Sequence, residues 1–150
     1  MSETLASVLV SLQDRQLLIP EVALVEVEPM SGLIVEARKE SWLLGHKHWS
    51  NQRIPVIAFE ILAGGHLRKH SEKARIAIFQ CSDEVTELRY WGMLIQGDAD
   101  KLEVSEDDLK LLSDEPSSAE CACISLQEKP VSIPNLAFIE QQLLASGVTH

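Results

Sequence analysis

A six-residue pattern occurs twice in this chain, and the two copies lie about half a chain length apart. Residues 54–59 have the sequence Ile-Pro-Val-Ile-Ala-Phe, and residues 133–138 have the sequence Ile-Pro-Asn-Leu-Ala-Phe. Each copy follows a turn-like stretch and precedes an apolar segment with helical spacing. Because self-similarity at a fixed spacing indicates repeated structural units, we expect two related halves.

A second echo keeps the same order and nearly the same spacing. Residues 17–19 (Leu-Leu-Ile) precede residues 26–27 (Glu-Val), and residues 93–95 (Met-Leu-Ile) precede residues 103–104 (Glu-Val). One apolar match between two segments is common. Two matches in the same order favour two quasi-equivalent β units.

Short strand-like segments separated by polar turns fill most of the chain. Alternating polar and apolar residues predict strands, and clusters of Asn, Asp, Gln and Ser predict turns. One hairpin is expected over residues 7–19 and another over residues 41–59, where Asn51 in the turn tolerates a left-handed backbone. Further strands are expected at residues 24–27, 74–80, 90–95, 101–104, 120–126 and 131–133, a turn at 82–84, and single helical turns at 21–24 and 60–65.

Two further segments predict helices. Ser105 and Asp108 form a capping pattern that predicts a short helix through residues 109–112, followed by a loop at 114–118. Residues 135–145 predict a C-terminal amphipathic helix. The apolar residues on one face of this helix are Leu136, Ile139, Leu143 and Leu144.

Many short strands with little helix indicate small barrels or a sandwich. Two such units within 150 residues are each too small to hold a full core, so they are expected to share apolar surface. A composition break near residues 66–73 places the first unit mostly within residues 16–65 and the second mostly within residues 74–134, with the termini packing across. The seam between two such units is a natural groove for an elongated partner.

Composition excludes several classes of partner. Thirteen Lys plus Arg against 23 Asp plus Glu give a net charge of -10, which repels nucleic acid and anionic membrane surfaces. The odd number of cysteines, Cys81, Cys121 and Cys123, indicates a reducing cytoplasm, and Cys81 and Cys123 lie in apolar patterns where thiols are usually inert fillers. No export signal and no membrane-spanning run is recognised. We expect a cytoplasmic protein with no nucleic acid partner and no membrane insertion.

Residues 42–57 resemble the CheW-like chemotaxis adaptor domain. Their sequence, Trp-Leu-Leu-Gly-His-Lys-His-Trp-Ser-Asn-Gln-Arg-Ile-Pro-Val-Ile, is similar to the family's apolar run, Gly, Asn-aromatic/aliphatic-Arg-Gly turn and hydrophobic-Pro-Val strand. Glu26 stands where the family has a Glu before a hydrophobic residue. Residues 91–95 (Trp-Gly-Met-Leu-Ile) are similar to the family's Gly-hydrophobic-hydrophobic-Val strand. The resemblance extends over nearly the whole chain.

This resemblance implies a mainly β fold of two five-stranded SH3-like β-barrels that share a hydrophobic seam, with short helices including a C-terminal one. It implies a non-enzymatic adaptor that needs no cofactor. Such an adaptor joins the cytoplasmic tip of a methyl-accepting chemoreceptor to the regulatory domain of a CheA-type histidine kinase, in arrays at the membrane.

The chain departs from the family pattern at the hairpin turn. His48 and the pair Ser50 and Asn51 stand where the family has Asn and Arg-Gly, and Ala58 stands where an Asp usually follows the strand. Because the family's turn Arg contributes to partner contacts, these departures favour an accessory adaptor. Accessory adaptors of the ChpC type occur in chemosensory systems that control type IV pili and twitching motility.

Two partner-binding surfaces are predicted. The resemblance places the kinase side on the first barrel, at Gly45, Trp49, Ser50 and Asn51. The echoed strands supply a receptor groove, with Leu24, Glu26 and Val27 facing Gly92, Met93 and Ile95. A helical receptor tip, with apolar residues every three to four positions, fits between two apolar walls. The alternatives are that these aliphatic residues fill barrel interiors, and that Trp49 caps a barrel instead of anchoring a partner.

Two other functions stay open at this point. His46 and His48 alternate on a strand, and His66 and His70 are spaced as on one helix face, so a small metal-dependent hydrolase using four histidines is imaginable. Isolated surface histidines are far commoner, and no metal site is predicted. A plain oligomeric structural domain is the other alternative.

Overall fold

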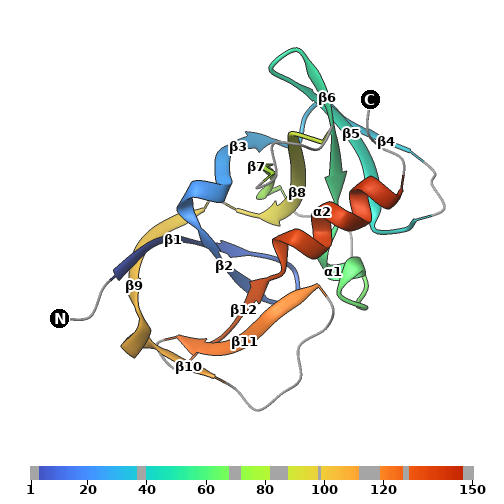
Figure 1. Cartoon of the computed structure of the whole chain (residues 1–150). Helices are drawn as coiled ribbons and strands as arrows, with labels where there is room; N and C mark the ends of the chain where they lie inside the picture. Colours follow the sequence, from blue (N-terminus) through green and yellow to red (C-terminus); the bar gives the residue numbers. More distant parts are fainter. Residues whose placement is uncertain are drawn as a thin grey trace.

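The chain is built from two mixed β-sheets, shown in the computed structural model of Figure 1. The structure describes residues 4–36, 40–67, 72–81, 88–97, 99–111, 119–126 and 129–146. The predicted turn at 82–84 and the predicted loop at 114–118 lie outside these residues. Within them the mainly β fold expected from the sequence is confirmed.

Each sheet has six strands among the described residues. Sheet A has the order β10-β11-β12-β2-β1-β9, and sheet B has the order β3-β7-β8-β6-β5-β4. The strands of sheet A are β1 (Thr4–Ser11), β2 (Gln16–Pro20), β9 (Asp100–Ser105), β10 (Leu109–Leu111), β11 (Glu120–Leu126) and β12 (Lys129–Pro134). The strands of sheet B are β3 (Leu24–Pro29), β4 (Leu33–Val35), β5 (Leu43–Trp49), β6 (Gln52–Ile57), β7 (Ala74–Gln80) and β8 (Tyr90–Gln96). In the part of the chain that is described, neither sheet pairs its two end strands with each other, so the expected five-stranded barrels are six-stranded and are not closed.

The two sheets correspond strand by strand. Sheet A, taken as β9-β1-β2-β12-β11-β10, has the same pairing directions as sheet B, taken as β3-β7-β8-β6-β5-β4: every pair is antiparallel except β2 with β12 and β8 with β6. Both sequence echoes fall on corresponding strands, namely β6 and β12, β2 and β8, and β3 and β9. The expectation of two quasi-equivalent β units is therefore confirmed.

The halves exchange their first hairpins. Hairpin β1–β2 joins sheet A, whose other four strands come from the second half, and hairpin β7–β8 joins sheet B, whose other four strands come from the first half. The sequence analysis placed β2 in the first unit and β7 and β8 in the second, and the observed pairing differs at these strands. The physical reason is that pairing partners such as β6 and β8 are distant in the chain, so local patterns carry no information about which sheet a hairpin enters.

Among the described residues there are three hydrophobic clusters, and the largest lies between the sheets. This seam core contains Val8, Val10, Leu12, Leu17, Ile19, Leu43, Ile57, Phe59, Ala77, Phe79, Leu88, Trp91, Met93, Ile95, Ala119, Ile139 and Leu143. Smaller clusters contain Leu18, Val104, Ile124, Leu126 and Val131 (the sheet A core) and Ile54, Val56, Ile76 and Ile78 (the sheet B core). Successive residues of one strand therefore enter different cores, as Leu17 and Leu18 do. The shared hydrophobic seam is confirmed.

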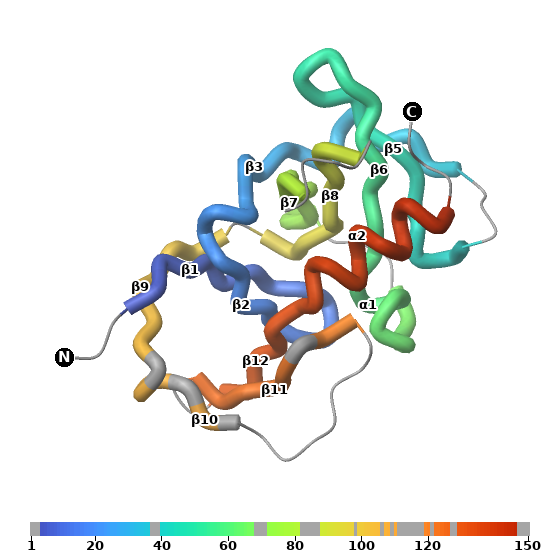
Figure 2. Tube along the Cα trace, viewed as in Figure 1, coloured from blue at the N-terminus to red at the C-terminus, as the bar shows by residue number. Residues whose placement is uncertain are grey.

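Helix α2 (Leu136–Ala145) follows β12 and covers the seam, as the tube in Figure 2 shows. Asn135 begins it, because its side-chain oxygen accepts a hydrogen bond from the Phe138 backbone N–H at 3.1 Å. Ile139 and Leu143 on one face are fully buried in the seam core. The predicted amphipathic C-terminal helix is confirmed. The shorter α1 (Phe59–Leu62) follows β6 at the corresponding place of the first half.

The helix predicted after Ser105 is wrong. The Asp108 carboxylate accepts hydrogen bonds from the Ser105 backbone N–H and hydroxyl at 2.9 and 3.0 Å, but this cap closes only the 3-10 turn η2 (Glu106–Asp108). The next residues form β10 and pair with β11. Tertiary pairing thus overrides the local helix signal. The 3-10 turn η1 (Glu21–Ala23) lies where a helical turn was expected.

We expect neither half of the chain to fold alone as a monomer when the protein is divided between residues 66 and 71. Each half would lose the hairpin that completes its sheet and would expose its side of the seam core. Thermal melts and the dispersion of amide NMR signals measure this. A full-length chain cleaved once in that segment is the control, since its two fragments still supply both hairpins. A cooperative melt from one monomeric half contradicts the prediction.

Candidate partner-binding site

A groove opens where the edges of the two sheets meet. It has a volume of about 240 Å³. We call it the seam groove, and it is lined by Val8, Glu21, Leu24, Val25, Glu26, Val27, Ala99 and Lys101. One wall comes from η1 and β3 of sheet B, and the other comes from β1 and β9 of sheet A. Because β3 and β9 are corresponding edge strands, the groove lies where the two halves of the repeat approach each other.

The structure supplies one of the two predicted groove walls. Leu24, Glu26 and Val27 line the seam groove, and their role in binding a receptor stays a prediction. Met93 and Ile95 are fully buried in the seam core. They belong to β8, a central strand covered on both faces, so they fill the interior as the alternative interpretation held.

Gly92 is also buried, and its neighbours leave little room for a side chain. A Cβ at this position would lie 2.9 Å from Ile76 Cγ2 and 3.2 Å from Val56 Cγ2, so only glycine lets strands β6, β7 and β8 approach so closely. The opposite wall of the groove is formed instead by Val8, Ala99 and Lys101. The sequence analysis missed this wall, and the echo of residues 26–27 at residues 103–104, on β9, is the sequence signal that could have pointed to it.

The seam groove combines aliphatic walls with carboxylates at its rim. Val25 is 41% exposed, which is high for a large apolar side chain in a strand. Glu21 pairs with Lys101 at 3.3 Å between exposed atoms, a contact worth little in stability. Glu26 accepts a hydrogen bond from the indole N–H of Trp49. The groove can therefore receive an apolar surface and orient it by charge.

The predicted kinase side is the hairpin β5–β6, which extends at the top of Figure 1. Ser50 and Asn51 form its tip, are exposed, and have φ values of 51° and 61°. Two successive residues in the left-handed region make the tight turn that twisted hairpins prefer, as expected for Asn51. These two side chains are available to a partner.

Gly45 is buried and serves the packing of the sheet. A Cβ there would lie 1.9 Å from the carbonyl oxygen of Ile34, on the neighbouring strand β4. No other residue fits without moving β4 away from β5. Gly45 therefore supports the hairpin from inside rather than touching a partner.

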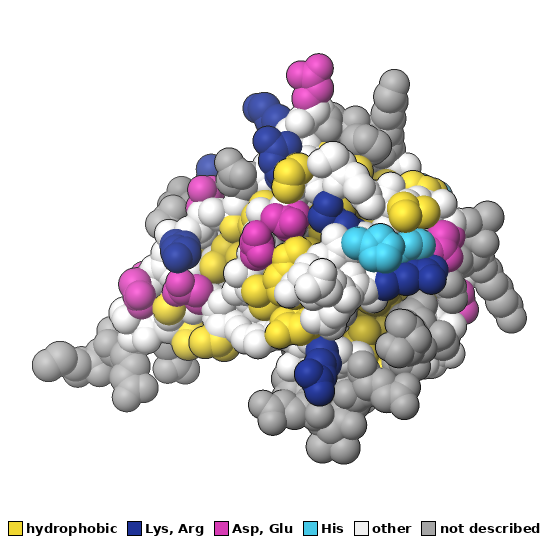
Figure 3. All heavy atoms as spheres, turned by 90° about the horizontal axis from the view of Figure 1, so that it is seen from above, with side chains coloured by type: hydrophobic (Ala, Val, Ile, Leu, Met, Phe, Trp, Pro, Cys, Tyr) yellow, Lys and Arg dark blue, Asp and Glu magenta, His cyan; other side chains and the backbone are white. Residues whose placement is uncertain are grey.

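Two of the four histidines considered for the alternative of a metal-dependent hydrolase lie close together. The rings of His46 and His48 lie 5.7 Å apart, His46 contacts Glu36, and Glu36 also accepts a hydrogen bond from Arg53 at 2.8 Å. Histidines gather beside a basic and an acidic side chain on the face in Figure 3. His70 lies outside the described residues. Within the described ranges no three His, Cys, Asp or Glu side chains form a group that could hold a metal.

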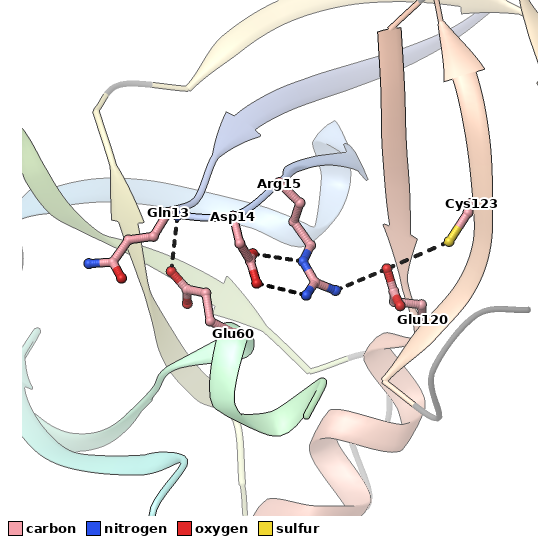
Figure 4. Close-up of polar contacts among 6 residues, drawn as sticks. All are labelled: Gln13, Asp14, Arg15, Glu60, Glu120 and Cys123. Carbon is pink, nitrogen blue, oxygen red and sulfur yellow. Dashed lines mark hydrogen bonds and ion pairs between the residues drawn. The ribbon is translucent and has the colours of Figure 1, made fainter. Parts of the chain in front are cut away.

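A polar cluster that the sequence analysis did not single out joins the two sheets (Figure 4). Arg15, in the turn after β1, holds Asp14 through two hydrogen bonds of 2.8 and 2.9 Å and reaches Glu120 of β11 at 3.2 Å. Its guanidinium also lies 5.4 Å from the centre of the Phe59 ring. The Gln13 backbone N–H donates to Glu60 of α1 at 3.1 Å. This turn therefore fastens sheet A to the end of sheet B.

Burial changes the acid-base behaviour of this cluster. It raises the pKa of Glu60 above the ordinary value of 4.5, although the backbone N–H groups of Glu60 and Gln13 oppose the shift. Burial and the charge of Glu120 also raise the pKa of the Cys123 thiol. A thiol with a raised pKa stays protonated and is a poor nucleophile, which agrees with its interpretation as a filler.

Comparisons with known proteins place the fold. Residues 6–142 match the family of CheW-like domains. The structure is similar to the scaffolding protein TtCheW from Thermoanaerobacter tengcongensis, with a TM-score of 0.74 and 16% identity over 89% of this chain and 90% of that chain. No curated protein matches the chain in a sequence search. Neither α-helix in the described part is long and apolar enough to cross a membrane.

We expect Glu60 to lower the free energy of unfolding as the pH rises. Between the ordinary value of 4.5 and its raised pKa, the folded protein holds a proton that the unfolded chain has lost, so stability falls as the pH increases through this window. Glu60→Gln removes the free-energy cost of ionising this buried carboxyl in the folded protein. The stability of the variant relative to the wild type should therefore increase as the pH rises through this window. Urea unfolding at a series of pH values measures it.

The control for this prediction is Glu36→Gln. Hydrogen bonds from His46 and Arg53 lower the pKa of Glu36, so its stabilising contribution is present above the ordinary pKa and is lost as the pH falls through the lowered value. The two variants should therefore depart from the wild type in opposite senses. Parallel curves for Glu60→Gln and the wild type at every pH would disprove the role of Glu60.

Proposed function

This chain belongs to the CheW-like family of non-enzymatic chemotaxis adaptors, and from that premise we propose that it holds a chemoreceptor against a CheA-type histidine kinase through two surfaces. The receptor tip occupies the seam groove, and the regulatory domain of the kinase contacts the tip of hairpin β5–β6. The observation that carries the proposal is the seam groove itself, whose aliphatic walls and charged rim come from both halves of the repeat. The adaptor is recruited in this way to receptor arrays at the membrane.

The chemistry of the seam groove supports a helical receptor tip as its occupant. A helix that presents apolar residues every three to four positions can bury them against Leu24, Val25 and Val27. The carboxylates at the rim, above all Glu26, orient a partner that carries basic residues. Most of the affinity then comes from a few apolar anchors and not from the charges.

The hairpin turn supports an accessory adaptor. Ser50 and Asn51 are exposed at the position where the family has Arg-Gly, so this chain offers no cation there. A weaker kinase contact follows from the loss of that charge. We propose an adaptor of the ChpC type, acting in a chemosensory system for type IV pilus twitching motility.

We expect Val25→Lys to weaken receptor binding by about tenfold or more, because it places a charge in the apolar wall of the groove. Val35→Lys is the matched control: Val35 is 73% exposed on β4, at the far edge of the same sheet from β3. Co-sedimentation with receptor-containing membranes measures binding, and circular dichroism checks the fold. Equal binding by the two variants would show that the receptor does not use the groove.

We expect the double change Ser50→Arg with Asn51→Gly to strengthen kinase binding by about two- to fivefold, the range for one partly exposed charge pair. Glycine at 51 relieves the positive φ, while Arg at 50 adds strain because Ser50 itself has a φ of 51°. Asn51→Gly alone is therefore the control. Calorimetry with the kinase regulatory domain measures the gain, and affinity equal to that control would show that Ser50 does not account for the divergence.

A further inference from the structure

The two proposed partner surfaces meet at one hydrogen bond. The indole Nε1 of Trp49 donates to Oε2 of Glu26 at 3.0 Å. Glu26 lines the seam groove on β3, and Trp49 is the last residue of β5 before the two exposed turn residues. Strands β3 and β5 are not neighbours in sheet B, so this side-chain contact spans the sheet from one partner surface to the other.

The Trp49 ring is fixed from beneath. It is half-buried against the sheet B core and meets the Tyr90 ring edge to face, with centroids 5.0 Å apart and an angle of 61° between the planes. A ring held on one side in this way can direct its N–H only within a narrow range. Glu26, by contrast, is an exposed residue with several rotatable bonds. Because the ring is fixed, the hydrogen bond restricts the Glu26 carboxylate to conformations that reach the indole N–H.

The Glu26 carboxylate also has an acidic neighbour on its own strand. Glu28 lies two residues along β3, and its pKa is raised by burial and then by the hydrogen bond and charge of Glu26, against the opposing charge of Lys47. The Lys47 ammonium donates to the carbonyl oxygen of Ser31 at 2.5 Å. Glu26 thus contacts both an indole donor and an acidic neighbour, and the N–H of Trp49 is the favourable one of these two contacts.

We propose that Trp49 is a positioning residue: its indole N–H holds the Glu26 carboxylate on the wall of the seam groove, so that an occupant of the hairpin turn and an occupant of the groove change each other's affinity. This inference rests on the proposed function of the two surfaces. A partner bound at the turn fixes or displaces Trp49, and Glu26 follows through the hydrogen bond. Linkage makes the effect reciprocal between the two partners.

The experiment separates the N–H of Trp49 from its ring. Trp49→Phe keeps an aromatic ring beside Tyr90 but removes the N–H donor together with one ring of the indole, and Trp42→Phe is the matched control for that loss of ring volume, at a half-buried tryptophan that packs against the seam core instead. The probes are a soluble chemoreceptor tip fragment and the regulatory domain of a CheA-type kinase, both from the source cell. Calorimetry measures the affinity for the tip fragment, with and without saturating kinase domain.

We expect Trp49→Phe to weaken tip binding by about tenfold, the loss typical of one hydrogen bond to a charged group. In the wild type, saturating kinase domain should change tip affinity by about fivefold, and this change should vanish in Trp49→Phe. In a Glu26→Ala background no acceptor is left, so Trp49→Phe should cause no further loss of affinity for the tip fragment. It should still cost affinity in a Glu26→Gln background, where the amide oxygen still accepts.

Two results would overturn the inference itself, and a third would overturn the proposed function on which it rests. If the wild type binds both probes and Trp49→Phe leaves tip affinity and the kinase effect unchanged, Trp49 does not position Glu26. If Trp49→Phe does not fold, the Glu26→Ala and Glu26→Gln chains decide alone: equal kinase effects in both would contradict the hydrogen-bonded link. If the wild type binds neither probe, the proposed function fails first and the inference falls with it.

Discussion

Burial of the seam core is the interaction on which the rest of this structure depends. It takes side chains from both sheets and from α2, and Trp91, Phe59 and Phe79 in it are fully buried. Each large apolar side chain removed from water contributes about 1.5–3 kcal/mol, an upper estimate for a real unfolded chain. The smaller clusters inside each sheet hold only four or five buried residues each. Neither half of the repeat therefore has a sufficient core of its own.

The exchange of hairpins between the two sheets determines where the seam groove lies. Since β1–β2 completes sheet A and β7–β8 completes sheet B, the chain passes from one sheet to the other directly after β2 and again after β8. These crossings bring the edge strands β3 and β9 together at the surface, over the seam core. An edge is where a sheet has accessible side chains and backbone, so the proposed partner surface lies at the same place as the link between the halves.

Polar contacts between side chains then hold neighbouring elements in place. Arg15 joins Asp14 and Glu120 at the turn that fastens sheet A to α1, and Trp49 joins the hairpin turn to the groove wall. The contacts of Arg15 with Glu120 and of Trp49 with Glu26 have no local sequence signature, because these partners are far apart in the chain. In both, a side chain in a turn or next to one reaches a carboxylate on another element, and the hydrophobic cores place those elements relative to each other.

The sequence by itself determined most of the strands but not β4 or β10, and it also determined the turn at Asn51, the C-terminal helix, the repeat and the shared seam, because alternation, turn residues and helical periodicity are local. It also identified one groove wall, at Leu24, Glu26 and Val27. Tertiary structure alone decided that Met93 and Ile95 are core, that residues 109–111 form a strand, and that Glu26 bonds to Trp49. A strand shows which of its residues are apolar, but only its neighbours decide whether one face or both are covered.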